Sequence, residues 1–258
     1  MEECKKVRFL ENNKSKVLRV GDIQALSTVD YPKEAVSVIF CYGCPFRCPF
    51  CFNKPLVIGN EYSSMTPREV SKSLERHRSY ITGVCFTGGE PLMQYYQLVQ
   101  LITEIKKLGL LVKLDTNGFY PKSLALLLDL VDYIAVDIKA TPKMYGTAIG
   151  MLKLATKAVK KLERSMTILS QSAVEYEFRT TIVPSLNDFA YDMKEICMFI
   201  KPYINEKQYI LQLFKPLHTL NPIYQQIRSP SYQAMRELKE VALSYLPYVE
   251  IRGVGNEV

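Results

Sequence analysis

Four of the seven cysteines of this chain lie within eleven residues, in the segment Cys41–Cys51 (CYGCPFRCPFC). Disulfide bonds are a poor interpretation, because the chain is long and its N-terminus lacks the apolar segment that directs export. A zinc site needs two ligand pairs held well apart, whereas only three residues separate Cys44 from Cys48. A compact loop can, however, wrap an iron–sulfur cluster, whose iron atoms lie close together. The segment therefore offers a cluster either four thiolates, or three with one to spare.

The spacing of three of these cysteines favours the second option. Cys44, Cys48 and Cys51 follow a C-x3-C-x2-C pattern, with the aromatic Phe50 directly before the last cysteine. This pattern resembles the signature of the radical S-adenosylmethionine (SAM) superfamily. The resemblance implies a [4Fe–4S] cluster with one open iron, which binds SAM and cleaves it reductively to a 5′-deoxyadenosyl radical. Catalytic metal sites leave such a position free. The alternative is a closed cluster that also uses Cys41 and serves structure or electron transfer.

The composition of the chain limits its class. With 258 residues and 48% hydrophobic content, it suits one α/β domain of barrel size. No apolar run approaches the ~18 residues that span a membrane. We expect a cytoplasmic protein, because many cysteines without an export signal favour reduced thiols and metal chemistry. The net charge of +7 is mild and spread over segments such as 153–161, so nucleic-acid binding is not indicated.

Strand-like and helix-like segments alternate along the chain. Short β-branched runs predict six strands separated by helices and a seventh, short strand, at 35–41, 84–86, 111–114, 133–138, 175–182, 208–213 and 248–251. Thr66, Pro67 and Glu69 form a capping box that starts one helix, and two later helices are expected at 151–165 and 229–245. This alternation predicts a parallel sheet with right-handed crossovers in one domain, residues 21–258, after a polar lead-in at 1–20.

Charged side chains alternate along the central strands, at the ends where α/β proteins place their sites. The period of two puts one set on a single face of the sheet: Lys113, Asp115, Asp137, Lys139, Glu177 and Arg179. Six charges would be too costly inside a packed, closed barrel. They predict an open, wetted partial barrel that holds a zwitterionic ligand. Arg179 suits a carboxylate clamp, because its guanidinium can bond two oxygens at once.

Other motifs allow a structural and a functional interpretation. Gly88-Gly89-Glu90 alone would be an ordinary turn, but one helix and one strand after the cysteine loop it resembles the GGE motif of the superfamily. That motif lets the backbone approach SAM and bonds its ammonium group. Asp115-Thr116-Asn117-Gly118 is equally consistent with a capped turn, and Asp137 with Lys139 is equally consistent with a structural ion pair. A single loop histidine such as His218 is more often structural or merely exposed.

Several segments resemble the glycyl-radical-enzyme activating enzymes, and the match covers about residues 20–252. Val29–Pro32 (VDYP), Glu175–Thr181 (EYEFRTT) and Leu211–Pro216 (LQLFKP) resemble more closely the activating proteins of anaerobic ribonucleoside-triphosphate reductase. The resemblance implies a partial (β/α)6 barrel of the radical SAM type and a monovalent cation shared by Asp115 and Asp137. It also implies a glycyl radical enzyme as partner and a low-potential electron donor such as flavodoxin or ferredoxin. The cofactor-binding residues that it implies are Phe50, Gly88, Gly89, Glu90, Asp115, Asp137, Lys139, Arg179 and His218.

Two positions depart from the pattern of the activating enzymes. Phe52 follows the last cluster cysteine, where His is usual, and Lys33 stands where a glycine usually follows Tyr-Pro. Both departures bear on the choice of partner, and neither touches the cluster cysteines. Another radical SAM reaction, on a peptide, an RNA or a small molecule, is the alternative within the enzymes. A non-catalytic iron–sulfur module is the alternative outside them, and SAM-dependent formation of 5′-deoxyadenosine separates the two classes.

Overall fold

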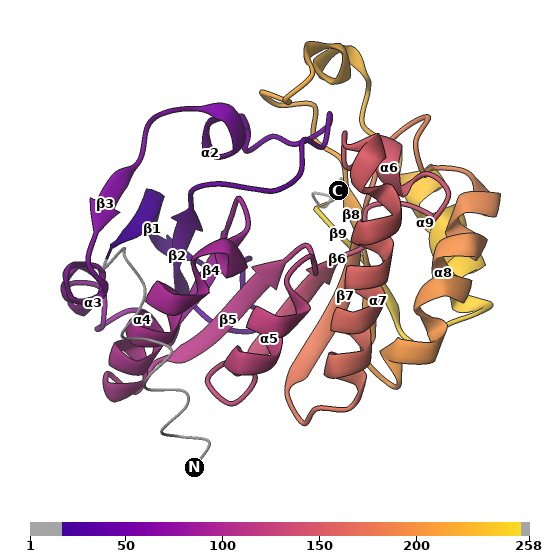
Figure 1. Ribbon diagram of the computed structural model, residues 1–258. Helices are drawn as coiled ribbons and strands as arrows, with labels where there is room; N and C mark the ends of the chain where they lie inside the picture. The colour runs from indigo at the N-terminus through magenta and orange to yellow at the C-terminus, as the bar shows by residue number, and fades with distance from the viewer. Residues whose placement is uncertain (1–16, 254–258) are drawn as a thin grey trace.

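The computed structural model describes residues 17–253, which form one sheet of nine strands with helices around it (Figure 1). The strand order is β3-β1-β2-β4-β5-β6-β7-β8-β9. Seven neighbouring strands are parallel: β2 (Val36–Cys41), β4 (Gly83–Gly88), β5 (Leu111–Thr116), β6 (Tyr133–Asp137), β7 (Glu175–Ile182), β8 (Gln208–Leu213) and β9 (Val249–Arg252). They confirm the seven strands expected from the sequence, with ends that differ by at most two residues.

Two antiparallel strands were not expected. β1 (Leu18–Ser27) pairs with β2, and β3 (Ser63–Met65) pairs with β1 at the edge of the sheet. Most of the lead-in expected at residues 1–20 lies outside the described residues, but its last three residues belong to β1. Within residues 17–253 the edge strands β3 and β9 do not pair, so the sheet stays open. The expected partial barrel is therefore confirmed.

Helices connect the parallel strands, and the larger ones cover the outer face of the sheet (Figure 1). Thr66 and Glu69 form the expected capping box at the start of α3, with Thr66 N–H donating to the Glu69 carboxylate at 2.7 Å. The helix expected at 151–165 is α7, which begins and ends later, at Ala155–Ser170. It begins later because Gly150 turns the chain with a φ of +63° and the 3-10 helix η2 (Leu152–Leu154) follows this turn. The helix expected at 229–245 is shorter, as α9.

The α-helices are α2 (Lys54–Ile58), α3 (Pro67–Glu75), α4 (Tyr95–Lys107), α5 (Pro121–Leu127), α6 (Tyr145–Ala148), α7 (Ala155–Ser170), α8 (Ala190–Ile204) and α9 (Tyr232–Leu243), and the other 3-10 helices are η1 (Pro91–Gln94) and η3 (Pro222–Gln226).

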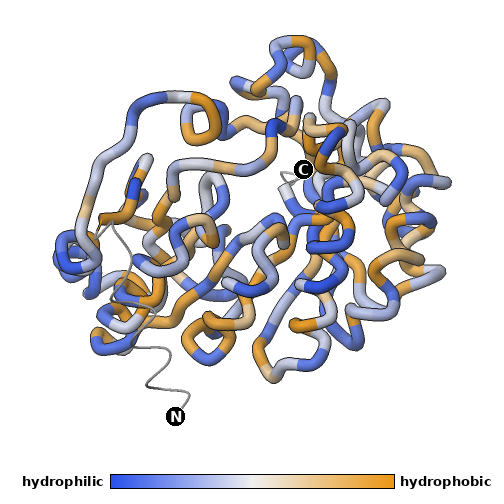
Figure 2. Tube along the Cα trace, viewed as in Figure 1, coloured by the Kyte–Doolittle hydropathy of each residue, from blue (hydrophilic) through white to orange (hydrophobic). Residues whose placement is uncertain are grey.

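The hydrophobic core lies between the outer face of the sheet and these helices. Ile134 and Val136 of β6 point into it and are fully buried, as are Leu101 and Ile105 of α4. In Figure 2, hydrophobic and polar stretches follow one another along the helices, as in elements with one buried face. The opposite face of the central strands carries the charged side chains, as the alternation predicts. No helix within residues 17–253 is long and apolar enough to cross a lipid bilayer.

Candidate active site

A cavity of about 460 Å³ lies at the carboxyl ends of the parallel strands, and this volume is within the range of small-molecule sites. Most of the site residues expected from the sequence border it. They come from the cysteine loop, the ends of β4, β5 and β6, and the middle of β7: Cys44, Cys48, Phe50, Cys51, Gly88, Gly89, Asp115, Asp137, Lys139 and Arg179. The structure thus brings the cysteine motif and the charged face of the sheet to one place.

Backbone hydrogen bonds from distant segments hold the cysteine loop. The N–H of Gly43 donates to Leu56 O at 2.8 Å, and the N–H of Arg47 donates to Ile149 O at 2.8 Å. After the last cluster cysteine, the carbonyl of Cys51 accepts from Leu220 N at 2.9 Å. None of these hydrogen bonds involves a thiol. They hold the loop in place and leave the cysteine side chains available to bind iron.

Gly88 and Gly89 allow the end of β4 to touch the cysteine loop. Gly88 has a φ of +106°, and a Cβ there would lie 2.7 Å from Cys41 N; a Cβ on Gly89 would lie 2.2 Å from Gly43 O. In the same contact, Gly89 N donates to Cys41 O at 2.8 Å. The two glycines were expected to let the backbone approach SAM. They border the cavity, but their tightest contacts are with the backbone of the cysteine loop.

Glu90 is fully buried, and its side chain does not border the cavity. Its carboxylate accepts hydrogen bonds from Leu92 N at 3.0 Å, Thr116 Oγ1 at 2.9 Å and Asn117 N at 2.8 Å. Burial raises the pKa of Glu90 to about 7, although these three donors favour the charged form. The Glu90 side chain therefore ties the end of β4 to the turn after β5, and any contact with a ligand would come from its backbone.

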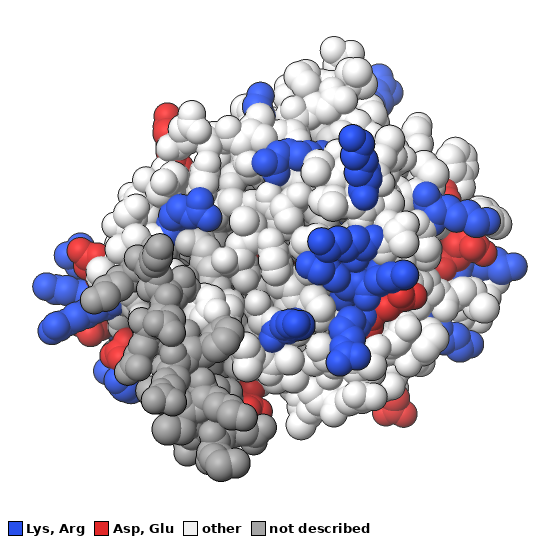
Figure 3. Space-filling view, viewed as in Figure 1, with Lys and Arg blue, Asp and Glu red and all other residues white. Residues whose placement is uncertain are grey.

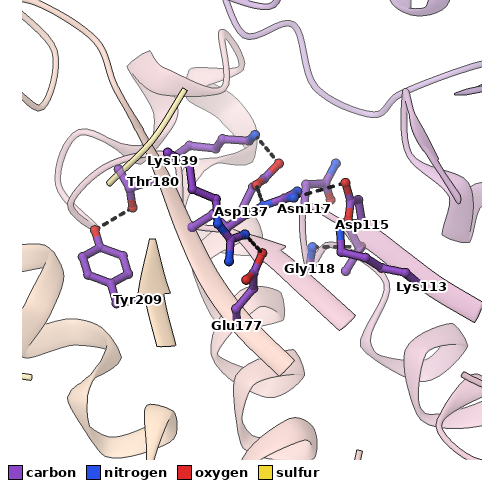
Figure 4. A network of polar contacts seen from close by, with 12 residues as sticks. Lys113, Asp115, Asn117, Gly118, Asp137, Lys139, Glu177, Thr180 and Tyr209 are labelled. Carbon is purple, nitrogen blue, oxygen red and sulfur yellow. Dashed lines mark hydrogen bonds and ion pairs between the residues drawn. The ribbon is translucent and has the colours of Figure 1, made fainter. Parts of the chain in front are cut away.

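The charged side chains form one network along the inner face (Figure 4). Arg179 bridges two carboxylates: its Nε lies 2.9 Å from Asp137 Oδ1, and its Nη1 lies 3.2 Å from Asp115 Oδ2. Lys113 pairs with Asp115, and Lys139 pairs with Asp137 at 2.9 Å. Glu177 also acts on Arg179 and is paired with Arg252, so four cations face three carboxylates, which leaves one positive charge in excess.

The pairing keeps Asp137 and Lys139 charged at neutral pH. Burial alone would raise the pKa of Asp137, but the charges of Arg179 and Lys139 bring it down to about 2. Burial alone would lower the pKa of Lys139, yet the Asp137 carboxylate outweighs it and raises that pKa. The surplus positive charge therefore persists beside the cavity, and it suits a ligand that carries a carboxylate.

From the sequence, we expected water in an open lumen to stabilise these charged side chains. The most buried of them are stabilised instead by ion pairs and hydrogen bonds with other side chains. Lys113 and Glu177 are 1% and 0% exposed. Glu177 accepts from Arg252 Nη1 at 2.7 Å and from the Tyr133 hydroxyl at 2.9 Å. Arg179 likewise uses two of its N–H groups on aspartates of the chain, rather than keeping its whole guanidinium for a ligand.

The three cavity cysteines suit an iron–sulfur cluster. Burial raises the pKa of Cys44 to about 12 and also raises the pKa of Cys48 and Cys51, so bound iron is what would stabilise their thiolates. Asn117 Nδ2 lies 3.8 Å from Cys44 Sγ. Cys41 is fully buried in the hydrophobic core and is absent from the described lining of the cavity. Three of the four clustered cysteines therefore border the cavity, which is the number that a cluster with an open position needs.

His218 is the expected site residue that the structure does not bring to the others. Its side chain is exposed, its φ is +48°, and it is absent from the described lining of the cavity. The neighbouring Leu217 does border the cavity, and Leu220 bonds the cysteine loop. The binding role of His218 stays a prediction.

Three amide side chains that sequence reasoning did not single out hold the site together. Asn53 Nδ2 donates to Gly88 O at 3.1 Å, and Gln94 accepts from Arg19 N at 2.7 Å while donating to Tyr42 O at 3.2 Å. Asn187 Nδ2 donates to Lys139 O at 3.0 Å. The only sequence signal among them was the position of Asn53, two residues after the last cluster cysteine.

Comparisons with known proteins agree with this site. The model of the Radical SAM superfamily matches residues 38–200. A protein of Methanocaldococcus jannaschii that carries the provisional name of glycyl-radical enzyme activating enzyme is 30% identical, over 92% of this chain and 96% of its own length. The pyruvate formate-lyase-activating enzyme of Clostridium pasteurianum is 28% identical, over 78% of this chain and 83% of its own.

A solved structure shows the same fold. The radical SAM methyltransferase of Sphaerobacter thermophilus aligns with a TM-score of 0.67 over 98% of this chain and 82% of its own, at 14% identity. That identity supports a likeness of fold and nothing finer. The family match and the relative at 30% identity show the family as well as the fold, because both span most of the domain that builds the cavity. The chain belongs to the radical SAM superfamily and is an enzyme of the glycyl-radical-enzyme activating type.

Proposed function

We propose that this enzyme activates an anaerobic ribonucleoside-triphosphate reductase by removing a hydrogen atom from the Cα of one glycine of that partner. The observation that carries the proposal is the meeting, in one cavity, of three cysteine thiols and a network with one surplus positive charge. The choice of this reductase rests on the resemblance of Val29–Pro32, Glu175–Thr181 and Leu211–Pro216 to its activating proteins.

Each part of the cavity has a role in this proposal. Cys44, Cys48 and Cys51 would hold a [4Fe–4S] cluster, which supplies the electron for reductive cleavage of SAM when both are bound. The surplus positive charge of the network would bind the SAM carboxylate, and the peptide groups of Gly88 and Gly89 line the wall beside it. Phe50 is buried and borders the cavity, and its ring would keep water away from a bound cluster.

The mouth of the cavity suits an extended segment of a partner protein. Phe52 and Leu217 both border the cavity and are 61% and 59% exposed, so they offer apolar contacts at the entrance. A glycine is a fitting target, because its Cα radical is flanked by two amide groups and its approach meets no side chain. An entrance of this kind supports a macromolecular substrate.

The electron would come from a low-potential protein such as a flavodoxin or a ferredoxin. We also propose that the protein works in the cytoplasm, since thiolates that hold a cluster need a reducing compartment. The contacts do not favour the monovalent cation implied at Asp115 and Asp137. Both carboxylates already bind cationic side chains, and an added cation would meet the surplus positive charge. The cation is therefore left out of the proposal.

The test is to mix the reconstituted, reduced enzyme with SAM and the anaerobic ribonucleotide reductase of the same organism. We expect an EPR doublet from a glycyl radical, which collapses toward a singlet when the reductase is produced with α-deuterated glycine. The amount of 5′-deoxyadenosine should match the amount of radical. The Cys44→Ala enzyme is the control, because it lacks a cluster ligand and should give neither product.

Two results would contradict the proposal in different ways. A doublet on pyruvate formate-lyase, with none on the reductase, would move the activity to the partner named by the Clostridium pasteurianum relative. Formation of 5′-deoxyadenosine without a radical on either protein would remove the activating role. It would favour another radical SAM reaction, on a peptide, an RNA or a small molecule.

A further inference from the structure

A row of basic side chains follows η2 and α7, and we call it the basic stripe. It consists of Lys153, Lys157, Lys160 and Arg164, all of which are exposed. Their spacings of four, three and four residues place them on one face of a helix. At 1.5 Å per residue, the stripe is about 16 Å long. In Figure 3, blue side chains gather over α7, and few red ones lie near them.

The stripe begins beside the cysteine loop. Arg47, which lies between Cys44 and Cys48, donates its backbone N–H to Ile149 O at 2.8 Å. A Cβ on Gly150 would lie only 2.0 Å from Arg47 O, so the two backbones are in direct contact. Lys153 follows three residues later. The Arg47 side chain is itself exposed and adds a further cation at this end.

A second contact joins α7 to the same loop. The Phe46 ring, two residues after Cys44, meets the Phe119 ring at a centroid distance of 5.2 Å. The ammonium of Lys161 lies 3.8 Å from the centroid of the Phe119 ring. The helix that carries the stripe therefore packs, through one aromatic layer, against the outside of the loop whose thiols face the cavity.

The positive charges of the stripe are not neutralised by the protein. None of its four side chains takes part in an ion pair within residues 17–253, and the single acid of α7, Glu163, is half-buried. Burial lowers the pKa of Lys161, and the like charge of Lys157 lowers it further. A partner with negative charges would relieve this repulsion.

An apolar side chain lies at the end of the stripe nearest the cysteine loop. Leu152 is 74% exposed and directly precedes Lys153. A small apolar centre with a charged rim is a common design of protein–protein contacts. Residues 152–170 contain no aromatic side chain on which a nucleic-acid base could stack. These features favour a protein over a single-stranded nucleic acid.

We propose that the basic stripe and Leu152 form the docking surface for a small acidic electron-transfer protein that reduces the cluster. This inference rests on the proposed function, which requires an electron at the cluster for each SAM cleaved. The reduced partner would lose one electron and the cluster would gain it, with no atom or proton transferred. Charge steering suits such a contact, because a brief encounter needs a fast approach and an easy release.

The test compares two reductants on the reconstituted enzyme. The first is the reduced flavodoxin or ferredoxin of the same organism, and the second is photoreduced 5-deazaflavin, which is small and uncharged. Stopped-flow absorbance follows reduction of the cluster. We expect the double variant Lys157→Glu/Lys160→Glu to be reduced about tenfold more slowly by the protein donor at low salt, and at the wild-type rate by deazaflavin. Added NaCl should slow the wild type and have little effect on the variant.

Two further variants make the test specific. Lys194→Glu/Lys201→Glu changes the same charge on α8, at exposed positions away from the cysteine loop, and should behave as wild type. Lys157→Gln/Lys160→Gln removes charge without reversing it, and should give an intermediate rate with the protein donor. A graded loss limited to the protein donor would support the docking surface.

Other outcomes would overturn it. Unchanged reduction of the glutamate variant by the protein donor would exclude the stripe, and so would an equal loss with both reductants. If the variant instead loses affinity for RNA or DNA while its reduction is unchanged, the stripe is a nucleic-acid surface. If the wild type forms no 5′-deoxyadenosine even with deazaflavin, the proposed function itself fails, and this inference fails with it.

Discussion

At the scale of single residues, the four clustered cysteines divide into three that border the cavity and one that does not. Cys41 ends β2 and is packed in the core, whereas Cys44, Cys48 and Cys51 face the cavity. After anaerobic reconstitution, we expect Ala at any of the three to abolish the [4Fe–4S] absorption and SAM cleavage. Cys41→Ala should keep both, because its thiol is not presented to the cluster.

A buried control makes this comparison fair. Cys197 of α8 is as buried as Cys41 and lies in another part of the core, so Cys197→Ala reports the effect of losing a core thiol. If Cys41→Ala loses its cluster while Cys197→Ala keeps it, the cluster has four cysteine ligands. The enzyme would then lack the open iron that SAM needs.

Arg179 is the residue on which the charged network depends, because it binds Asp115 and Asp137 at once. A lysine keeps the charge but cannot bond both carboxylates at once, so either Asp115 or Asp137 keeps only its lysine partner. We expect Arg179→Lys to weaken SAM binding by about 1.5–3 kcal/mol, or roughly tenfold to a hundredfold. Anaerobic calorimetry measures this affinity, and Arg236→Lys on the exposed face of α9 is the control. An unchanged affinity would limit Arg179 to a structural role.

At the scale of elements, the turn between α6 and η2 fixes the position of the cysteine loop. Gly150 has a φ of +63° and no room for a Cβ, whereas Gly109 has a φ of +73° and nothing within 4 Å of a Cβ. We expect Gly109→Ala to lower the free energy of unfolding by about 1–2 kcal/mol, which is the cost of the backbone conformation alone. Gly150→Ala should lower it further and also reduce the iron bound per chain, because the clash moves Arg47.

Denaturant unfolding and iron analysis of the two variants check this prediction. If both variants lose the same free energy and keep full iron content, the contact between Gly150 and Arg47 does not position the loop. If iron content falls in Gly150→Ala alone, a residue about 100 positions along the chain from the cluster ligands helps to position them.

The link between β4 and the turn after β5 depends on the protonation of Glu90. Its pKa is raised from 4.5 to about 7 in the folded protein, so its contribution to stability is full below pH 4.5 and is lost as the pH rises to about 7. The loss amounts to at most about 3 kcal/mol. Glu90→Gln should flatten the dependence of the unfolding free energy between pH 5 and 7, measured by urea denaturation, whereas the exposed Glu206→Gln should not. A slope that persists in Glu90→Gln would assign it to another group.

Elements were predictable where burial made their pattern simple. Most of the central parallel strands are buried on both faces and read as short apolar runs such as Val36–Cys41, in which five of the six residues are buried. β1 escaped prediction because its register shifts between Val20 and Asp22, and again between Gln24 and Ser27, so the alternation of its polar and apolar residues is interrupted. A strand with two irregularities and an exposed second half carries little signal in its sequence.

At the scale of the whole molecule, the sequence predicted which side chains share the site better than it predicted their partners. The period of two decides which face of a strand a residue lies on, so Asp137 and Arg179 could be placed together. Their pairing follows from the register of β6 on β7, which places the two residues directly opposite each other. This register cannot be predicted from the sequence of either strand alone. The supporting amides Gln94 and Asn187 depend on loop geometry, which local patterns do not encode.

The backbone hydrogen bonds that anchor the cysteine loop affect what happens to the enzyme when oxygen destroys its cluster. Leu56, Ile149 and Leu220 hold the loop by its backbone, and no thiol takes part. Because these bonds involve no iron ligand, we expect the loop to keep its conformation without a cluster, so that its conformational entropy is lost on folding. Folding and metal uptake are then separate events, unlike those of small domains that collapse only around a metal. A molecule stripped of its cluster by oxygen would keep its shape, and repair would require iron and sulfide rather than a new polypeptide.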